Sequence, residues 1–447
     1  MASSIESPSR PSSLPGPDSI VRQELANGIV VLSRANPSSA SFVVNGSLPA
    51  GGIFDPNEQL GLAGFTASAL MRGTQDYTFL EIYDQIESIG ASLGFSAGTH
   101  HVNFSGRALI EDFEHLLFFL AQALRKPVFP AEHVERLRAQ LLTALAIRAQ
   151  DTAEMASLAF DRIVYRDHPY CRPEDGYPET IQTIQPLDLV EFHKSHYGPQ
   201  GMLISVVGGL DPASAIDSLC KIFEDWQNPE QMTSPDIPPA FPLPRRSSQH
   251  VQIPGKFQSD LAIGAAGPTR MSADYLPASL GNHVLGRFGM MGRLGKSLRE
   301  DAGIAYYASS SLSGGLGPGP WEVSAGVDPD NLEKAVDLVL AEIERFCVEP
   351  VGVDELADSQ ANYTGRLPIS FESNSGVASA LITLERYQLG LDYYLRYPDL
   401  VNAVTPERIL EVTLHYLDPD RLAIVTAGPG AEPAHERPGE DHDREAE

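Results

Sequence analysis

The sequence predicts an α+β protein made of two homologous domains, each a mostly antiparallel sheet with helices packed on one face, joined by a Pro-rich linker. Three observations predict this fold. The chain has 447 residues, enough for two or three domains. A segment near the end of each half repeats the same order of elements. In each half, short strands precede a run of amphipathic helices, which is typical of helices layered on an antiparallel sheet.

The repeated segments are LVEFHKSHYGPQGMLISVVG at 189–208 and ILEVTLHYLDPDRLAIVTAG at 409–428, which align without a gap at an offset of 220 residues. Both are predicted to form an amphipathic helix, a turn with Pro, and a buried strand that ends at Gly. The four identities are Glu191/Glu411, Pro199/Pro419, Ile204/Ile424 and Gly208/Gly428. Four identities could arise by chance, so the shared order of elements is what indicates a duplicated domain.

Apolar residues at helical spacing predict an equivalent helix upstream in each half. The stripes are Phe113, Leu116, Leu117, Leu120 and Leu124 in the first half, and Leu332, Ala335, Val336, Val339 and Leu340 in the second. A second helix is predicted after each, around 133–149 and 353–363. The strands predicted before them span 29–33, 42–48, 91–96 and 102–107, then 251–254, 261–265, 305–311 and 321–327.

Residues 227–248 contain six prolines, which exclude a continuous helix or central strand and predict a semi-extended linker. The predicted organisation is therefore a Ser/Pro-rich disordered arm (1–20), an N-terminal domain (21–226), the linker, a C-terminal domain (249–430) and an acidic disordered tail (431–447).

Composition restricts the class of protein. Lys and Arg total 32 against 59 Asp and Glu, a net charge of −27, which opposes binding to a nucleic-acid backbone. The three widely spaced cysteines support no disulfide framework and favour a reducing compartment. The most apolar runs have the length of a strand, too short to cross a bilayer. We therefore expect a cytoplasmic protein without nucleic-acid or membrane partners.

Four stretches, at 27–65, 69–74, 175–208 and 292–312, resemble the pitrilysin-like zinc metallopeptidases, or inverted zincins, and in particular their bacterial branch similar to mitochondrial processing peptidase. That family also includes the core proteins of the respiratory bc1 complex and bacterial two-subunit peptidases. The last two stretches, DGYPETIQTIQPLDLVEFHKSHYGPQGMLISVVG and GRLGKSLREDAGIAYYASSSL, are specific in combination. The resemblance covers nearly the whole chain between the two tails.

Active members carry His-x-x-Glu-His, in which two imidazoles four residues apart bind one Zn²⁺ and the Glu acts as general base. At the corresponding positions this chain has Gly64, Ala67 and Ser68, and the family's third ligand, a Glu, would fall near Ala144. The resemblance therefore implies that this chain holds no metal, and that zinc belongs to a partner subunit. Freed of ligands, these small residues are expected to allow close helix packing.

Two other histidine pairs are candidates for a replacement metal site. Glu191, His193 and His196 share a predicted helix, but a solvated helix face is the simpler interpretation. His100 and His101 are adjacent in a strand, where neighbouring side chains point to opposite faces. Neither pair predicts a zinc site.

The family's other functional element is present. In active single-chain members an Arg and a Tyr seven residues apart reach the substrate, and LREDAGIAY places Arg299 and Tyr306 at that separation. A guanidinium can make paired hydrogen bonds to the substrate, and a phenol can donate to the oxyanion formed at the attacked carbonyl. The alternative is a surface Arg paired with Glu300 or Asp301 and a Tyr in the core. The surrounding sequence favours the functional interpretation.

Four glycines, Gly286, Gly289, Gly292 and Gly295, lie three residues apart in LGRFGMMGRLG. They lack the strand and helix context of a nucleotide-binding loop. In processing peptidases the zinc-free subunit has a glycine-rich loop in this part of the chain that contacts substrate. The resemblance makes the four glycines candidates for substrate binding, with a helix entry turn as the alternative.

The leading hypothesis is the zinc-free subunit of a heterodimeric peptidase, which supplies Arg299 and Tyr306 in trans to a homologous zinc-carrying subunit and encloses a peptide substrate. The acidic body could steer basic peptides toward it. The alternative is a proteolytically inactive structural subunit that resembles the bc1 core proteins. An autonomous enzyme with another mechanism ranks last, because no Ser/His/Asp or Cys/His arrangement supports one.

Overall fold

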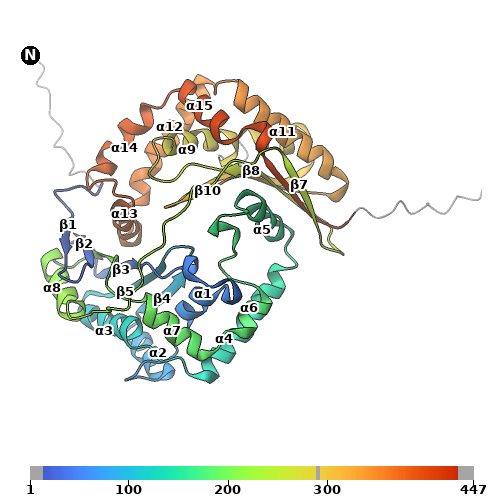
Figure 1. Cartoon of the computed structure of the whole chain (residues 1–447). Helices are drawn as coiled ribbons and strands as arrows, with labels where there is room; N and C mark the ends of the chain where they lie inside the picture. Colours follow the sequence, from blue (N-terminus) through green and yellow to red (C-terminus); the bar gives the residue numbers. More distant parts are fainter. Residues whose placement is uncertain (1–13, 288–291, 431–447) are drawn as a thin grey trace, which may run out of the picture.

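The computed structural model describes residues 14–287 and 292–430, which form two halves that each contain one sheet and a layer of helices (Figure 1). The first sheet has the strand order β1-β2-β6-β3-β5-β4 and the second β7-β11-β8-β10-β9. In each sheet one pair is parallel, β2 with β6 and β7 with β11, and the other pairs are antiparallel. The two sheets therefore share one plan, which confirms the predicted two-domain α+β fold.

The strand bounds agree with the sequence in most places. The first sheet contains β1 (Val21–Glu24), β2 (Val30–Ala35), β3 (Ser41–Leu48), β4 (Ser92–Ala97), β5 (Val102–Leu109) and β6 (Leu203–Gly208). The second contains β7 (Ser247–Gln252), β8 (Ser259–Ala266), β9 (Ala305–Gly314), β10 (Pro318–Val327) and β11 (Ala423–Gly428). The strand predicted at 251–254 was misplaced and β1 was not predicted. Both β1 and β7 are mostly exposed outer strands, so neither has the apolar pattern of a buried strand.

The repeated segments both fold as helix, turn and strand. The helices of the first half are α1 (Leu62–Ala69), α2 (Phe79–Ser88), α3 (Phe113–Arg125), α4 (Ala131–Arg148), α6 (Pro178–Thr183), α7 (Pro186–His196) and α8 (Pro212–Phe223). Those of the second half are α9 (Tyr275–Asn282), α10 (Arg293–Gly295), α11 (Leu332–Val348), α12 (Val353–Ser370), α14 (Tyr393–Asn402) and α15 (Pro406–Tyr416). The apolar stripe predicted for α3 is buried against its own sheet, which removes the largest apolar surface of this helix from water. Of the stripe predicted for α11, Ala335 and Val339 are buried, whereas Leu332, Val336 and Leu340 are only partly buried against the core.

Two further helices cross between the halves. Helix α5 (Thr152–Val164) follows α4 in the first half but packs on β8 and β11 of the second sheet, with Phe160 against Ala262 and Val425. Helix α13 (Asn374–Arg386) follows α12 and packs on β3 and β6 of the first sheet. Each sheet thus carries its own helices on one face and one helix of the other half on its second face (Figure 1). The one-face arrangement predicted from the sequence lacks these two helices.

The segments around the linker are also packed. Residues 227–246 contain no helix or strand, and the carbonyl of Pro238 lies 2.8 Å from His168 Nε2. Ile20, which the sequence placed in the disordered arm, is buried in the cluster with α13 because its side chain is apolar. The predicted domain boundaries stay a prediction, and residues 1–13 and 431–447 lie outside the described residues. Within residues 14–287 and 292–430, no helix has the length and apolar character needed to cross a bilayer.

Carboxyl groups face each other where α5 meets the second sheet. Glu322 on β10 is shielded from water, and burial, with a contribution from Glu154, raises its pKa to about 7. Burial likewise raises the pKa of Asp161 on α5 to about 7, and the charges of Glu322 and Glu174 add to this effect. Ionising these groups therefore opposes the packing of α5.

This cluster predicts a pH-dependent stability. Glu322 ionises near pH 4.5 in the unfolded chain but only near pH 7 in the folded protein. The stability that its bound proton contributes is therefore fully present below pH 4.5 and is lost as the pH rises from there through about 7. Glu322→Gln stays neutral, so at pH 8 it should be more stable than the wild type by roughly 1–3 kcal/mol, and near pH 4 the difference should vanish. Urea unfolding at both pH values measures this. The exposed Glu333→Gln serves as control, and an equal effect of Glu322→Gln at both pH values would contradict the prediction.

Candidate functional site

Helix α1 carries Gly64, Ala67 and Ser68, the positions at which the sequence predicts a degenerate motif, and it is held at its start by a buried carboxylate. The backbone N–H of Gly61 donates to Asp55 Oδ2 at 2.8 Å and that of Ala63 donates to Oδ1 at 2.9 Å. Arg172 donates to the carbonyls of Asp55 and Ile53, both at 3.0 Å. Burial raises the pKa of Asp55 to about 7, although the hydrogen bonds from α1 oppose the shift. Sequence reasoning missed this group, whose only signal is an Asp shortly before a helix.

On α1, Gly64 and Ser68 are four residues apart and share the open face of the helix. A Cβ at Gly64 would meet only the carbonyl oxygen of Glu174, at 3.9 Å, and Ser68 is exposed. Ala67 is 2% exposed and belongs to the core. The expected close packing therefore holds at Ala67, whereas Gly64 and Ser68 leave open the face on which the resemblance would place the two imidazoles.

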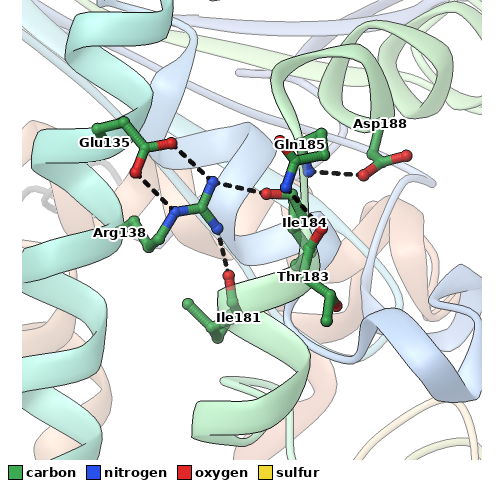
Figure 2. Close-up of polar contacts among 7 residues, drawn as sticks. All are labelled: Glu135, Arg138, Ile181, Thr183, Ile184, Gln185 and Asp188. Atoms are coloured by element: carbon green, nitrogen blue, oxygen red, sulfur yellow. Dashed lines mark hydrogen bonds and ion pairs between the residues drawn. The ribbon is translucent and has the colours of Figure 1, made fainter.

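Helix α4, which carries the exposed Ala144, is fixed to its neighbours by Arg138 (Figure 2). Its guanidinium donates to the carbonyl of Ile184 at 2.6 Å, to that of Ile181, and to both oxygens of Glu135 at 3.0 Å. Its Cζ also lies 5.6 Å from the ring centroid of Phe65 on α1. One buried side chain therefore joins α1, α4 and the end of α6, so the helices that carry positions 64, 68 and 144 have a defined arrangement.

The side chains at these positions do not fit a zinc ion. Gly64, Ala67 and Ala144 have no donor atom, and Ser68 offers only a hydroxyl. Nearby polar groups have other partners: Thr99 donates to Glu174, and His100 Nε2 lies 2.6 Å from the Tyr170 hydroxyl. Across residues 14–287 and 292–430, no group of three or more His, Cys, Asp or Glu side chains is placed to hold a metal.

The two histidines of α7 make structural contacts. His193 Nε2 lies 2.9 Å from the carbonyl of Leu124, and the His196 ring packs 4.4 Å from the rings of Phe54 and Phe192. Burial lowers the pKa of both histidines to about 4. The solvated face predicted for this helix was wrong, since its histidines point into the protein. The low pKa values are those of neutral imidazoles in an apolar environment.

Arg299 and Tyr306 are both presented to solvent. Arg299 lies in the π-helical turn η7 (Lys296–Asp301), is exposed, and forms no ion pair with any described residue, Glu300 and Asp301 included. Tyr306 is 57% exposed and sits at a bulge, since Ala305 pairs with Val327 and Tyr307 with Gly326. The extra residue leaves Tyr306 outside the ladder. The substrate role of Arg299 and Tyr306 stays a prediction.

Tyr307, the neighbour of Tyr306, has a structural contact. Its hydroxyl donates to Asp260 Oδ1 at 2.6 Å, and Thr152 of α5 donates to the other oxygen of the same carboxylate. Asp260 thereby joins β9 to the crossing helix. The tyrosine that is held by the fold is thus Tyr307, while Tyr306 is left exposed.

The glycine series is used for close packing where it is described. A Cβ at Gly286 would come within 2.6 Å of the Ser310 nitrogen, and one at Gly292 within 2.9 Å of Gly286 Cα. Gly295 is buried in α10, and Gly289 lies outside the described residues. These contacts agree with a helix entry that packs on β9, and the proposed substrate contact stays a prediction.

Arg293 anchors the same segment. It donates to the two oxygens of Glu355 at 2.9 and 2.7 Å, and its Cζ lies 5.4 Å from the Phe346 ring centroid. The pKa of Glu355 is lowered mainly by this hydrogen-bonded guanidinium. The segment that leads to Arg299 is therefore tied to both α11 and α12.

The chain matches two models of one peptidase family. Residues 30–173 match "Insulinase (Peptidase family M16)" and residues 183–363 match "Peptidase M16 inactive domain". Together with the duplicated fold, these matches show that the chain belongs to peptidase family M16, the pitrilysin-like family that the sequence motifs resemble.

Relatives and solved structures agree with the family over most of the chain. An uncharacterized zinc protease of Rickettsia bellii is 22% identical over 392 residues, which cover 88% of this chain and 90% of the relative. A probable mitochondrial-processing peptidase subunit beta of Arabidopsis thaliana is 23% identical over 210 residues, 47% of this chain and 40% of that protein. The crystal structure of a peptidase M16 inactive domain from Pseudomonas fluorescens superimposes with a TM-score of 0.86 at 25% identity and covers 92% of this chain and 98% of its own.

Arg138→Ala should lower the free energy of unfolding by about 2–4 kcal/mol, because two buried carbonyls would lose their donors. Chemical denaturation measures the loss. Arg136→Ala on the same helix is the matched control, since Arg136 is exposed and paired only with Glu132, and it should cost under about 0.5 kcal/mol. Similar losses for the two variants would show that Arg138 does not join the helices.

The triple variant Gly64→His, Ser68→His and Ala144→Glu should bind about one Zn²⁺ per chain after dialysis, while the wild type should retain almost none. The reason is that the open face of α1 has room for the two imidazoles and α4 is already fixed beside it. Metal analysis by mass spectrometry provides the readout. Gly64→His with Ala144→Glu, which has only two ligands, is the control. Stoichiometric zinc in the wild type, or none in the triple variant, would refute this interpretation.

Proposed function

We propose that this chain is the zinc-free subunit of a heterodimeric M16 peptidase. Its partner is a homologous chain that carries the complete His-x-x-Glu-His motif and the zinc ion. This chain closes the chamber around a peptide and presents Arg299 and Tyr306 to the substrate held at the partner's zinc. Alone it cleaves nothing.

The observation that carries the proposal is a contrast between two sets of residues in this chain. The side chains expected for zinc binding are missing, whereas those expected for substrate binding are present. Positions 64, 67, 68 and 144 offer neither imidazole nor carboxylate, although the helices that bear them are retained and tightly fixed. Arg299 and Tyr306, in contrast, are exposed and have no partner among the described residues that would account for them. A guanidinium and a phenol without structural duties are suited to a peptide carbonyl and its developing oxyanion.

The outer strands of the two sheets support an extended peptide as substrate. Strand β4 is the last strand of the first sheet and contacts α1, and β9, which carries Tyr306, is the last strand of the second. The unpaired N–H and C=O groups of an outer strand can bind an extended peptide by adding it as a further strand. Unfolded peptides or short precursor segments meet this requirement.

The names of the relatives agree with this division of roles. Relatives that match over most of the chain are named zinc proteases, one partial relative is named a processing-peptidase subunit, and the similar solved structure is named an inactive domain.

Cys171, Cys220 and Cys347 are unpaired, which supports the cytoplasm as the compartment. A structural subunit without proteolysis remains the alternative, and the experiment below separates the two.

The complex should cleave unfolded peptides, and Arg299→Ala or Tyr306→Phe should each lower its kcat/KM by about 10- to 100-fold with assembly intact. The measurement is peptide cleavage by the purified chain mixed with the homologous His-x-x-Glu-His subunit of the same organism, with assembly followed by size-exclusion chromatography. Glu300→Gln, an exposed neighbour, is the control and should leave the rate unchanged.

Three outcomes would contradict the proposal. Cleavage by this chain alone would refute the zinc-free role, and unchanged rates for both variants would refute the assignment of Arg299 and Tyr306. A stable complex without peptidase activity would favour the structural alternative.

A further inference from the structure

A cavity in the helical layer of the second half is distinct from the open face of α1. It lies among α9, α12, α13 and α14 and has a volume of about 450 Å³, within the usual range for small-ligand sites. Its lining contains Arg270, Arg366, Asn362, five tyrosines and several Ser and Thr side chains, but no Asp or Glu. In a chain with 59 acidic and 32 basic residues, this concentration of cations without carboxylates is unusual. We call it the Arg270 cavity.

Arg270 is held by aromatic rings and not by an anion. Its Cζ lies 4.5 Å from the ring centroid of Tyr275 and 5.6 Å from that of Tyr393, and Nη2 donates to the Tyr393 hydroxyl at 3.1 Å. A guanidinium has five N–H donors, and the other side-chain donors of Arg270 reach no acceptor among the described residues. No described carboxylate lies within ion-pair distance of it.

Two other well-shielded arginines differ in this respect. Arg293 is paired with Glu355, and Arg138 with Glu135 and two carbonyls. In these two cases the guanidinium is paired with a carboxylate and joins elements of the fold. Arg270 instead lines an open space with unused donors, as does the exposed Arg366 across the same cavity.

A third group in the lining points to the chemistry of the ligand. The Oδ1 atom of Asn362 is buried and accepts no hydrogen bond from any described residue. A ligand that satisfies both groups needs an anionic head for Arg270 and an N–H or O–H donor for Asn362. The tyrosine rings of the lining require an apolar or aromatic body between or beside these groups.

We propose that the Arg270 cavity binds the C-terminal carboxylate of a short peptide. The carboxylate takes two hydrogen bonds from the Arg270 guanidinium, a geometry that matches both planar groups. The Asn362 Oδ1 atom accepts from a peptide N–H, and the tyrosine rings enclose the terminal side chain. The inference does not depend on the proposed function, because it concerns another part of the chain and needs no partner subunit.

The test uses the full chain alone, with isothermal titration by acetyl-Ala-Ala-Phe as the free acid and as the C-terminal amide. The two peptides differ only in the anionic head, so the acid should bind about ten- to a hundredfold more tightly. Arg270→Gln should remove this difference, and Arg366→Gln should reduce it several-fold. Arg396→Gln is the matched control, because Arg396 lies on α14 but is paired with Asp392 and does not line the cavity.

Equal affinity for acid and amide in the wild type would overturn the proposal. So would binding of inorganic phosphate that depends on Arg270 without binding of the peptide acid, since the site would then hold a free anion. If thermal melting shows that Arg270→Gln does not fold, the exposed Arg366→Gln variant and the wild-type comparison decide. In that case an acid preference of the wild type that Arg366→Gln leaves unchanged would also overturn the proposal.

Discussion

The reciprocal packing of α5 and α13 is the constraint on which the arrangement of the two halves depends. Each helix leaves the half in which its neighbours in the chain lie and covers the second face of the other sheet. The second apolar face of each sheet is therefore shielded from water only when the other half, which supplies the covering helix, is folded beside it. The Asp260 carboxylate, which receives hydrogen bonds from Thr152 and Tyr307, adds a directional contact to this apolar packing.

The retained scaffold around α1 has a simple physical reason. Asp55 caps the start of the helix, Ala67 is part of the core, and Arg138 holds α4 against Phe65. These contacts lie on the sides of the helix that face the protein, whereas Gly64 and Ser68 lie on the side that faces away from it. Side chains on the open face can thus differ without a cost to packing, so the fold around α1 does not depend on which residues occupy positions 64 and 68.

Much of the fold follows from the sequence because apolar periodicity reports burial against a chain's own sheet. The stripe of α3 and the repeated helix–turn–strand segments are therefore where they were predicted, and the stripe of α11 is confirmed in part. The same periodicity does not say which sheet a helix covers, so the crossing of α5 and α13 could not be found. Mostly exposed outer strands such as β7 lack the signal altogether.

Motifs and their spacing could predict which residues belong to the candidate site but not how the fold arranges them. Spacing identified Arg299 and Tyr306, but the bulge that separates Tyr306 from Tyr307 depends on the register of β9 against β10. Arg138 and Asp55 matter through contacts distant in sequence, and a lone Arg or Asp in a helix or turn carries no sign of them. The cations of the Arg270 cavity come from a loop and from α12, and only the fold brings them together.

The crossed helices also bear on how a chamber formed by this chain can open. A hinge between its two halves would have to strip α5 and α13 from the sheets they cover and expose both apolar faces to water at once. Such a motion is costly because apolar surface would be transferred into water. In the heterodimer that we propose, access for a long substrate is therefore expected to come from separation of the two protomers, with this chain moving as a rigid shell.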